Sequence, residues 1–341
     1  MKKLTMFWLV VLTAAPATYA AQASFSFGRQ NGRATFIYGD NLVTNVMPEV
    51  DSVRFEALKV EDQVQRKAAG LSAVMVTPNG SLYESKMDSK DVAIFEAALK
   101  NLEALGRLAT TVGTAPTLAT RAANGAQGPG FSLPVPEIVI GTDQRVQVTN
   151  TVAAPYWHIG RIAVGCTGTL ISAKHVLTAG HCVSNGAGSW YSSLNFTVAQ
   201  NGSYQPWGTK SWTRAITTSA WHNSADSNYD YAMIVLSAPP HGGNSGWGVY
   251  TGGTHTITGY PGDKPSGTMW TDSGAVSTSG SYRLCYTIDT AGGQSGSGIA
   301  DGGGAYVRGI HTTGSSTQNC GTRLTSTVYN TLQNWISTYP N

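Results

Sequence analysis

The sequence predicts a mostly β protein, an antiparallel barrel or sandwich, which ends in one helix and follows a small α+β segment. From residue 138 onward, short β-branched and aromatic runs alternate with Gly, Ser, Asn and Thr turns. Many short strands with frequent turns are typical of such folds. Strands are expected within residues 145–152, 158–164, 175–180, 231–236, 254–260 and 305–312. In "STVYNTLQNWIST", at residues 326–338, the apolar residues share one helical face.

Residues 21–137 have a different character. "SAVMVTPNGSLYE" predicts a β-hairpin that turns at Pro78-Asn79-Gly80, and the apolar spacing over residues 89–108 suits an amphipathic helix. Residues 112–137 are rich in Gly, Pro, Ala and Thr without an apolar period. Such a composition is typical of an exposed linker that proteases cut.

Residues 1–20 have the pattern of a secretory signal. Two lysines precede the apolar run "MFWLVVLTAA", and small residues follow in "ATYA". A membrane anchor is the alternative, but it needs a longer apolar run. We therefore expect cleavage after Ala20 and export.

Four cysteines lie in the later part of the 341-residue chain: Cys166, Cys182, Cys285 and Cys320. An even number in an exported protein favours two disulfides, although four cysteines allow three pairings. There is no C-x-x-C pair, so a zinc cluster is not expected. The net charge of +3 is small and dispersed, which does not point to a nucleic-acid partner.

One histidine lies in a setting that favours chemistry. In "GCTGTLISAKHVLTAGHCV", Cys166 and Cys182 flank a stretch that a hairpin could close, so a disulfide between them would fix His181. A general base needs such fixed geometry. Asp230 precedes the apolar run of "NYDYAMIVL", where an acid could orient an imidazole, whereas nearby Asp226 fits a solvated turn.

The stretch "DTAGGQSGSGI" holds two serines, Ser295 and Ser297. Gly and Ser also cluster in ordinary turns, so an unreactive loop is the alternative reading. The glycines would let backbone N–H groups face a developing oxyanion while a serine hydroxyl attacks.

The order His, Asp, Ser with "TAGHC", "DYA" and "GGQSGSG" resembles the chymotrypsin-like serine peptidases. "VIGTDQRVQVTNTVAAPYWHIGRI", "YTIDTAGGQSGSG" and "GIHTTG" resemble their glutamyl endopeptidase branch. The resemblance spans residues 138–337 and implies two six-stranded antiparallel β-barrels with the active site in the cleft between them. It also implies that His181 is the general base, Asp230 orients it and Ser295 is the nucleophile. The backbone amides of Gly293 and Ser295 would form the oxyanion hole.

The resemblance further implies a pocket for an acidic side chain. His311 and Thr290 would contact the substrate carboxylate, since a histidine and hydroxyl groups can bind one without a permanent buried cation. The free α-amino group of Ile138 would lie near this pocket, because the alignment of "IVIGTDQR" starts the mature chain there. With the first cysteine pair assigned to the histidine loop, Cys285 and Cys320 form the second expected bridge.

The acidic residues support the same substrate independently. All seven Glu lie at or before Glu137, whereas residues 138–341 contain seven Asp and no Glu. An enzyme that cuts after Glu could release itself at Glu137, and its mature part would benefit from having no Glu.

Two positions depart from the wider family. Gln294 stands where pancreatic-type enzymes have the Asp that pairs with a new amino terminus, and the glutamyl branch lacks that Asp too. Gly298 stands where the family commonly has Pro. Activation by the pancreatic ion pair is therefore not expected.

The function that the sequence predicts is a secreted serine endopeptidase that cuts after Glu and more slowly after Asp. One alternative is a peptidase of the same fold with another preference, and another is an inactive homologue that acts as a binding module. A metalloprotease is disfavoured because a region without Glu holds no H-E-x-x-H. We expect a monomer without cofactor, metal, nucleic-acid or membrane partner. Its partners would be protein or peptide substrates and its own pro-region, residues 21–137, which would aid folding or block the cleft of the peptidase domain, residues 138–341.

Overall fold

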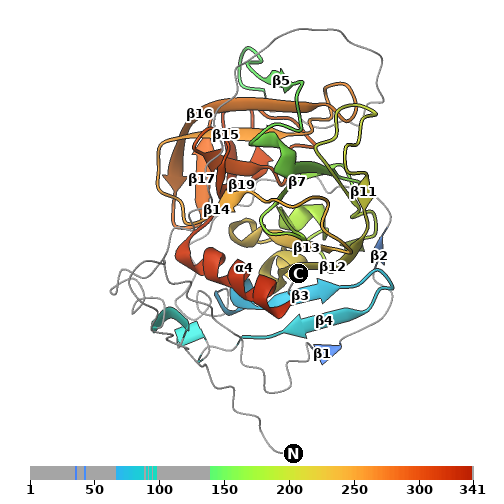
Figure 1. The fold of residues 1–341 in the computed structure, drawn as a ribbon. Coiled ribbons are helices and arrows are strands. Elements are labelled where there is room, and N and C mark those ends of the chain that lie inside the picture. The colour runs from blue at the N-terminus through green and yellow to red at the C-terminus, as the bar shows by residue number, and fades with distance from the viewer. Residues whose placement is uncertain are drawn as a thin grey trace, which may run out of the picture.

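The structure, a computed structural model, describes residues 67–87, 90, 92–93, 95–97 and 139–339, and the backbone of 35–36 and 42–43. The expected signal peptide 1–20, the linker 112–137 and Ile138 lie outside these residues. In residues 139–339 the chain is mostly β, as expected (Figure 1).

One sheet holds the strands between residues 159 and 236, except β9 (Trp190–Tyr191). They are β6 (Ile159–Ile162), β7 (Cys166–Leu170), β8 (His175–Thr178), β10 (Phe196–Val198), β11 (Thr209–Lys210), β12 (Trp212–Thr218) and β13 (Ala232–Leu236). Neighbours pair in the order β12-β13-β8-β7-β6-β10-β11, all antiparallel. Because only Ser211 separates β11 from β12, the two ends of this run meet and the sheet rolls into a barrel.

The second sheet closes into a ring of six strands. They are β15 (Thr254–Gly259), β16 (Met269–Ser279), β17 (Arg283–Tyr286), β18 (Gly298–Asp301), β19 (Tyr306–Gly314) and β20 (Asn319–Arg323). The pairing runs β18-β15-β16-β17-β20-β19 and returns from β19 to β18. No apolar pattern in the sequence predicts β16, the longest of the six, because most of its residues are at least partly exposed and few are apolar.

Other short strands extend the second sheet or form a separate two-stranded sheet, β2-β9. β5 (Val146–Val148) pairs with β16. Two pairings are parallel, unlike the expected antiparallel pattern: β14 (Gly246–Trp247) with β19, and β2 (Leu42–Val43) with β9 (Trp190–Tyr191).

Helices are few in residues 139–339. They are η1 (Tyr156–His158), η2 (Gly180–Cys182), α3 (Ser219–Ser224), η3 (Ser227–Tyr229) and α4 (Ser326–Thr338). The expected C-terminal helix is confirmed as α4. Thr325 caps it, since its hydroxyl accepts the Val328 N–H. None of the described helices is long and apolar enough to cross a bilayer.

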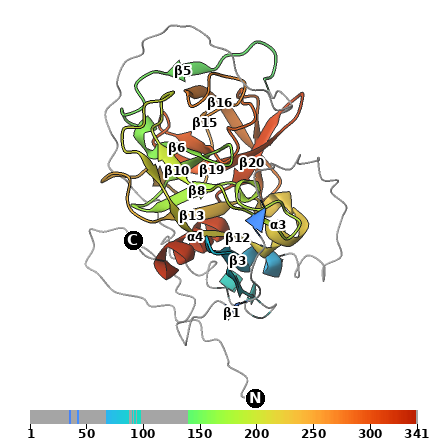
Figure 2. The same cartoon turned by 90° about the vertical axis from the view of Figure 1, so that its right-hand side faces the viewer.

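The predicted hairpin is confirmed as β3 (Ala73–Val76) and β4 (Leu82–Ser85), with Gly80 at a φ of +82° in the turn. Residues 67–71 are helical, as are 90, 92–93 and 95–97 within the expected helix 89–108; its other residues lie outside the described set. β4 also pairs with β1 (Thr35–Phe36). The sequence did not predict that β3 pairs with β12, so that the hairpin extends the first sheet (Figures 1 and 2).

Each sheet encloses its own apolar cluster. The larger cluster unites the first sheet, α4 and the hairpin, and includes Ile216, Leu332 and Val76. A smaller one lies inside the second ring, around Ile257 and Leu284. The larger cluster also includes Val307 and Ile310 of β19, so it packs the second sheet against the first.

Candidate active site

His181 and Asp230 are joined by two hydrogen bonds. His181 Nδ1 lies 2.8 Å from Asp230 Oδ2, and the His181 backbone N–H donates to Asp230 Oδ1 over 2.9 Å. Both side chains are buried, His181 in η2 after β8 and Asp230 between η3 and β13. A carboxylate held in this way orients the ring and keeps a proton on Nδ1, so Nε2 is the basic nitrogen.

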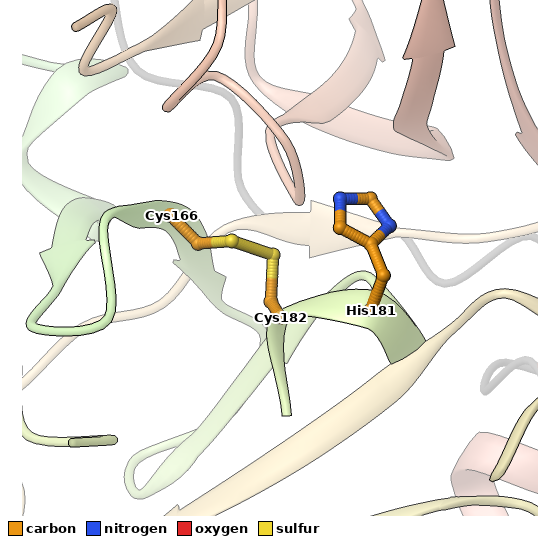
Figure 3. A group of neighbouring side chains, drawn as sticks. All are labelled: Cys166, His181 and Cys182. Atoms are coloured by element: carbon orange, nitrogen blue, oxygen red, sulfur yellow. A yellow bond between two sulfur atoms is a disulfide. The ribbon is translucent and has the colours of Figure 1, made fainter. Parts of the chain in front are cut away.

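The turn that carries His181 is fixed on two sides. Cys182 forms the expected disulfide with Cys166 of β7, next to the His181 ring (Figure 3). The Trp221 indole packs edge-on against that ring, with 5.9 Å between the ring centres. Gly180 has no room for a side chain, because a Cβ there would lie 2.7 Å from Trp221 Cγ. The imidazole therefore has little freedom to move.

Ser295 lies in the loop before β18, and its backbone is bound to the first sheet. Its carbonyl oxygen accepts the Thr167 N–H over 2.9 Å and lies 3.5 Å from Cys182 Sγ. Ser295 is half-buried, whereas Ser297 is buried. The loop thus brings Ser295 beside the disulfide that fixes His181. Among the described contacts, the Ser295 hydroxyl and His181 Nε2 form no hydrogen bond, as is common before substrate binds.

The backbone around Ser295 presents two free N–H groups. The carbonyl of the peptide before Gly293 accepts the Gly262 N–H over 2.6 Å, and that of the peptide before Ser295 accepts the Ser297 N–H over 2.9 Å. In a trans peptide the N–H points opposite to the carbonyl, so both N–H groups face away from these partners. Neither donates to another described residue. Gly293 has a φ of +97°, and a Cβ there would lie 2.5 Å from the Tyr260 carbonyl oxygen.

Arg145, which was not predicted as a site residue, anchors this loop. Its fully buried guanidinium forms ion pairs with Asp143 and Asp263 and donates to Gln294 Oε1 over 3.3 Å. The same Gln294 oxygen accepts the Ala291 N–H over 3.0 Å. Because 149 positions separate Arg145 from Gln294, no local pattern in the sequence indicates this contact.

Thr290 and His311 are both buried near the Ser295 loop. Thr290 lies in that loop, and its hydroxyl has no hydrogen-bond partner among the described residues. His311 of β19 is bound to the loop by its backbone, since its carbonyl accepts the Gly296 N–H over 2.8 Å. His311 Nδ1 lies 2.7 Å from the Tyr286 hydroxyl. Burial, followed by the positive charges of neighbouring groups, lowers the pKa of His311 to about 3, so the ring is neutral at pH 7.

A permanent cation, which the sequence did not indicate, is also buried close enough for its charge to act on His311. Arg283 is buried, and it donates to the Ser227 carbonyl and to Thr313 Oγ1, each over 2.7 Å. None of the ion pairs among the described residues involves it. After burial and the charge of His181, the charge of Arg283 also lowers the pKa of His311. The surroundings of His311 therefore include a buried guanidinium, on which the charges of Asp230 and Asp226 also act.

Ile138 lies outside the described residues, but the segment that follows it is anchored beside Thr290. The buried Asp289 carboxylate accepts the Ile140 N–H over 2.9 Å and the Gln144 N–H over 2.8 Å. Asp289 immediately precedes Thr290, so the two N–H groups hold the segment next to that residue. The second expected disulfide, Cys285–Cys320, is also formed and joins β17 to β20.

A family model described as Trypsin matches residues 139–336. The chain belongs to the trypsin family. The match includes both sheets, but it leaves out the β3–β4 hairpin. The trypsin-family region is therefore the part that holds His181, Asp230 and Ser295.

Similar proteins narrow the assignment. A glutamyl endopeptidase of Bacillus licheniformis is 40% identical over 218 residues, which cover 58% of this chain and 68% of that protein. A solved Glu endopeptidase in complex with MPD is 34% identical with a TM-score of 0.54, and covers 59% of this chain and 100% of that chain. This trypsin-family chain is a serine endopeptidase of the glutamyl endopeptidase branch, with the chymotrypsin-like fold that the sequence predicted.

Another relative carries a different name. A protein of Bacillus subtilis named extracellular metalloprotease is 38% identical over 223 residues, which cover 59% of this chain and 71% of that protein. Within the described residues, one group has the spacing of metal ligands: Cys166, His181 and Cys182. Its two sulfurs are joined in a disulfide and offer no thiolate, and His181 Nδ1 faces Asp230. This group does not fit a metal ion.

Proposed function

We propose that this chain is a secreted glutamyl endopeptidase, made as a precursor, that cuts after Glu and less rapidly after Asp. The observation that best supports peptidase catalysis is the pair of hydrogen bonds between His181 and Asp230. These leave Nε2 free as a base beside the loop of Ser295. A paired imidazole is the group that a serine hydroxyl needs to become a nucleophile.

In the proposed reaction, Ser295 Oγ attacks the scissile carbonyl carbon while its proton passes to His181 Nε2. The N–H groups of Gly293 and Ser295 stabilise the resulting oxyanion, and Asp230 stabilises the imidazolium. The leaving amine then takes the proton from Nε2, and the carbonyl remains bound to Ser295 as an ester. Water hydrolyses the ester by the same steps, again with His181 as the base.

The preference for Glu rests on the buried groups at the end of the Ser295 loop. Thr290 offers a hydroxyl that has no hydrogen-bond partner in the described part of the chain, and His311 offers a neutral ring. The Tyr286 hydroxyl can donate to His311 Nδ1, which would leave an N–H on Nε2 to bind a carboxylate. Arg283 adds a positive charge to these surroundings. The α-amino group of Ile138 would join them after maturation, since Asp289 anchors the segment that follows.

The precursor would mature by cleavage after Glu137, and residues 21–137 would act as its pro-region. The absence of Glu from residues 138–341 supports self-release, because the product then lacks sites for its own activity. Amino-terminal sequencing of the exported protein should give Ile138 as the first residue. Glu137→Gln should slow maturation, and unchanged processing would show that another protease makes the cut.

Two experiments test the function. Peptides that differ only at the residue before the scissile bond should be cut fastest with Glu, more slowly with Asp, and at least about 100-fold more slowly with the isosteric Gln. Equal rates would instead support a peptidase of the same fold with another preference. A serine-directed phosphonylating reagent should label the wild type and Ser297→Ala but not Ser295→Ala. Absence of labelling in the wild type would support an inactive binding homologue.

A further inference from the structure

The β3–β4 hairpin lies outside the trypsin-family region, yet it is part of the same sheet. β3 pairs with β12 over four positions, from Ala215 opposite Val76 to Thr218 opposite Ala73. The Ser219 N–H extends the pairing by donating to the Ser72 carbonyl over 2.9 Å. In an antiparallel pair, hydrogen-bonded positions alternate. Since Ser219 and Ser72 form one hydrogen-bonded pair, the pairs two and four positions away, Thr217 with Val74 and Ala215 with Val76, are also hydrogen-bonded.

The interface is apolar as well as hydrogen-bonded. Val74 and Met75 are each 6% exposed and Val76 is 0% exposed, and all three belong to the same cluster as Ile216 and Trp335. Among the described strands β11 adjoins β12 but does not pair with it, so without the hairpin residues 215–218 of β12 would have unpaired backbone groups and exposed apolar side chains. Edge strands of that kind are normally covered or paired.

The same segment supports the residues on both sides of Asp230. Gly70 packs directly on the Tyr229 ring, because a Cβ there would lie 1.9 Å from its Cε1 atom. The Tyr231 hydroxyl donates to the Gly70 carbonyl over 3.4 Å. On β12 itself, the Thr218 hydroxyl donates to the Tyr229 carbonyl over 3.1 Å. The Thr217 hydroxyl donates to the Tyr231 carbonyl over 2.9 Å.

We infer that residues 67–87 bind the edge of β12 by strand addition and stay bound to the trypsin-family domain after the linker at 112–137 is cut. The partner that this surface fits is thus the chain's own released amino-terminal piece. That piece completes the first sheet and supports the backbone around Asp230. The inference rests on the proposed maturation, in that it concerns the state of the protein after the cut. Strand addition of this type binds through main-chain hydrogen bonds and alternate side-chain pockets.

The test uses the full chain with Ser295→Ala and a recognition sequence for an unrelated protease in the linker. After cutting with that protease, size-exclusion chromatography and native mass spectrometry should find the two pieces together at a 1:1 ratio. Separate elution at micromolar concentration would overturn the inference. The Ser295→Ala chain is inactive and an unrelated protease makes the cut, so the test does not depend on glutamyl peptidase activity. Separation of the pieces would therefore overturn this inference without bearing on the proposed function.

A matched pair of variants locates the interface. Val76→Asp places a carboxylate at a fully buried position, and the cut pieces of this variant should separate. Asn79→Asp adds the same charge at the exposed turn and keeps the side-chain oxygen that accepts from Thr77 and Ser81, so its pieces should stay together. Separation of the Asn79→Asp pieces, or retention of the Val76→Asp pieces, would contradict this interface.

Hydrogen exchange provides a measurement that does not require variants. The amides of Ala215 and Thr217 should be equally protected before and after the linker is cut, because both donate to β3. Loss of their protection on cutting would show that the hairpin leaves β12, and would overturn the inference even if Val76→Asp fails to fold.

Discussion

The Arg145 guanidinium donates a hydrogen bond to Gln294 Oε1, which links the beginning of the trypsin-family domain to the residue before Ser295. Gln294 also binds the Ala291 N–H, so one side-chain oxygen closes the turn that contains Gly293. In pancreatic-type relatives this position is an Asp that pairs with a new amino terminus. Here an internal cation approaches the same position, and it is in place in the full-length chain.

We predict that Gln294→Met lowers kcat by about 10- to 100-fold and changes KM by less than about twofold. Methionine fills a similar volume but accepts no comparable hydrogen bond from Ala291 or Arg145. The Gly293 and Ser295 N–H groups would then be less well aligned, and loss of one oxyanion donor typically costs about 10²- to 10³-fold. Steady-state kinetics with a Glu peptide, normalised to active sites titrated with a phosphonylating reagent, would measure the effect. Gln318→Met, at an exposed position, is the control, and an unchanged kcat in Gln294→Met would contradict the role.

We predict that Asp289→Asn loosens the segment after Ile138. The amide group of asparagine would set a donor against one of the two N–H groups that the carboxylate now accepts, which leaves a buried donor unsatisfied at a cost of about 1–3 kcal/mol in the free energy of unfolding. Hydrogen exchange should show faster exchange at the Ile140 and Gln144 amides. Asp226→Asn keeps the oxygen that caps Asn228 and should leave the stability nearly unchanged. Unaltered protection at both amides of Asp289→Asn would contradict this prediction.

We predict that Thr290→Val lowers kcat/KM for a Glu peptide by about 10- to 100-fold, since valine has the shape of threonine but donates no hydrogen bond to a carboxylate. The kcat/KM for a Gln peptide should fall much less, so the ratio of kcat/KM for Glu over Gln decreases. Thr290→Ser keeps the hydroxyl and should retain most of the preference. A Thr290→Val enzyme with the specificity of the wild type would show that the hydroxyl does not contact the substrate.

We predict that acid destabilises the fold through its buried histidines. Burial lowers the pKa of His222 to about 4, below its ordinary value of 6.5. Between these pH values the unfolded state binds more protons than the folded state, so the free energy of unfolding falls as the pH decreases. His158 and His311, each with a pKa of about 3, act in the same direction. Tm should therefore fall from pH 7 to pH 4.5, and less steeply in His222→Gln. Parallel Tm curves for the wild type and this variant would refute the contribution of His222.

Much of the fold and the site follows from local patterns. The β-rich class, the β3–β4 hairpin and α4 were predictable because each depends on residue spacing within a short segment. Both cysteine pairs were also predicted correctly. His181 and Asp230 could be proposed from their sequence surroundings, and the structure joins them as expected.

The order of the motifs and the distribution of Glu were determined by the sequence alone, because both are properties of the linear chain. Only the tertiary structure decided that Arg145 binds Gln294, that Arg283 lies near His311 and that β3 adds to β12. Each of these relationships joins residues that are far apart in sequence, and no local pattern at either residue indicates the other. They depend on which strands pair within each sheet and on which loops pack together, and both are decided only as the chain folds.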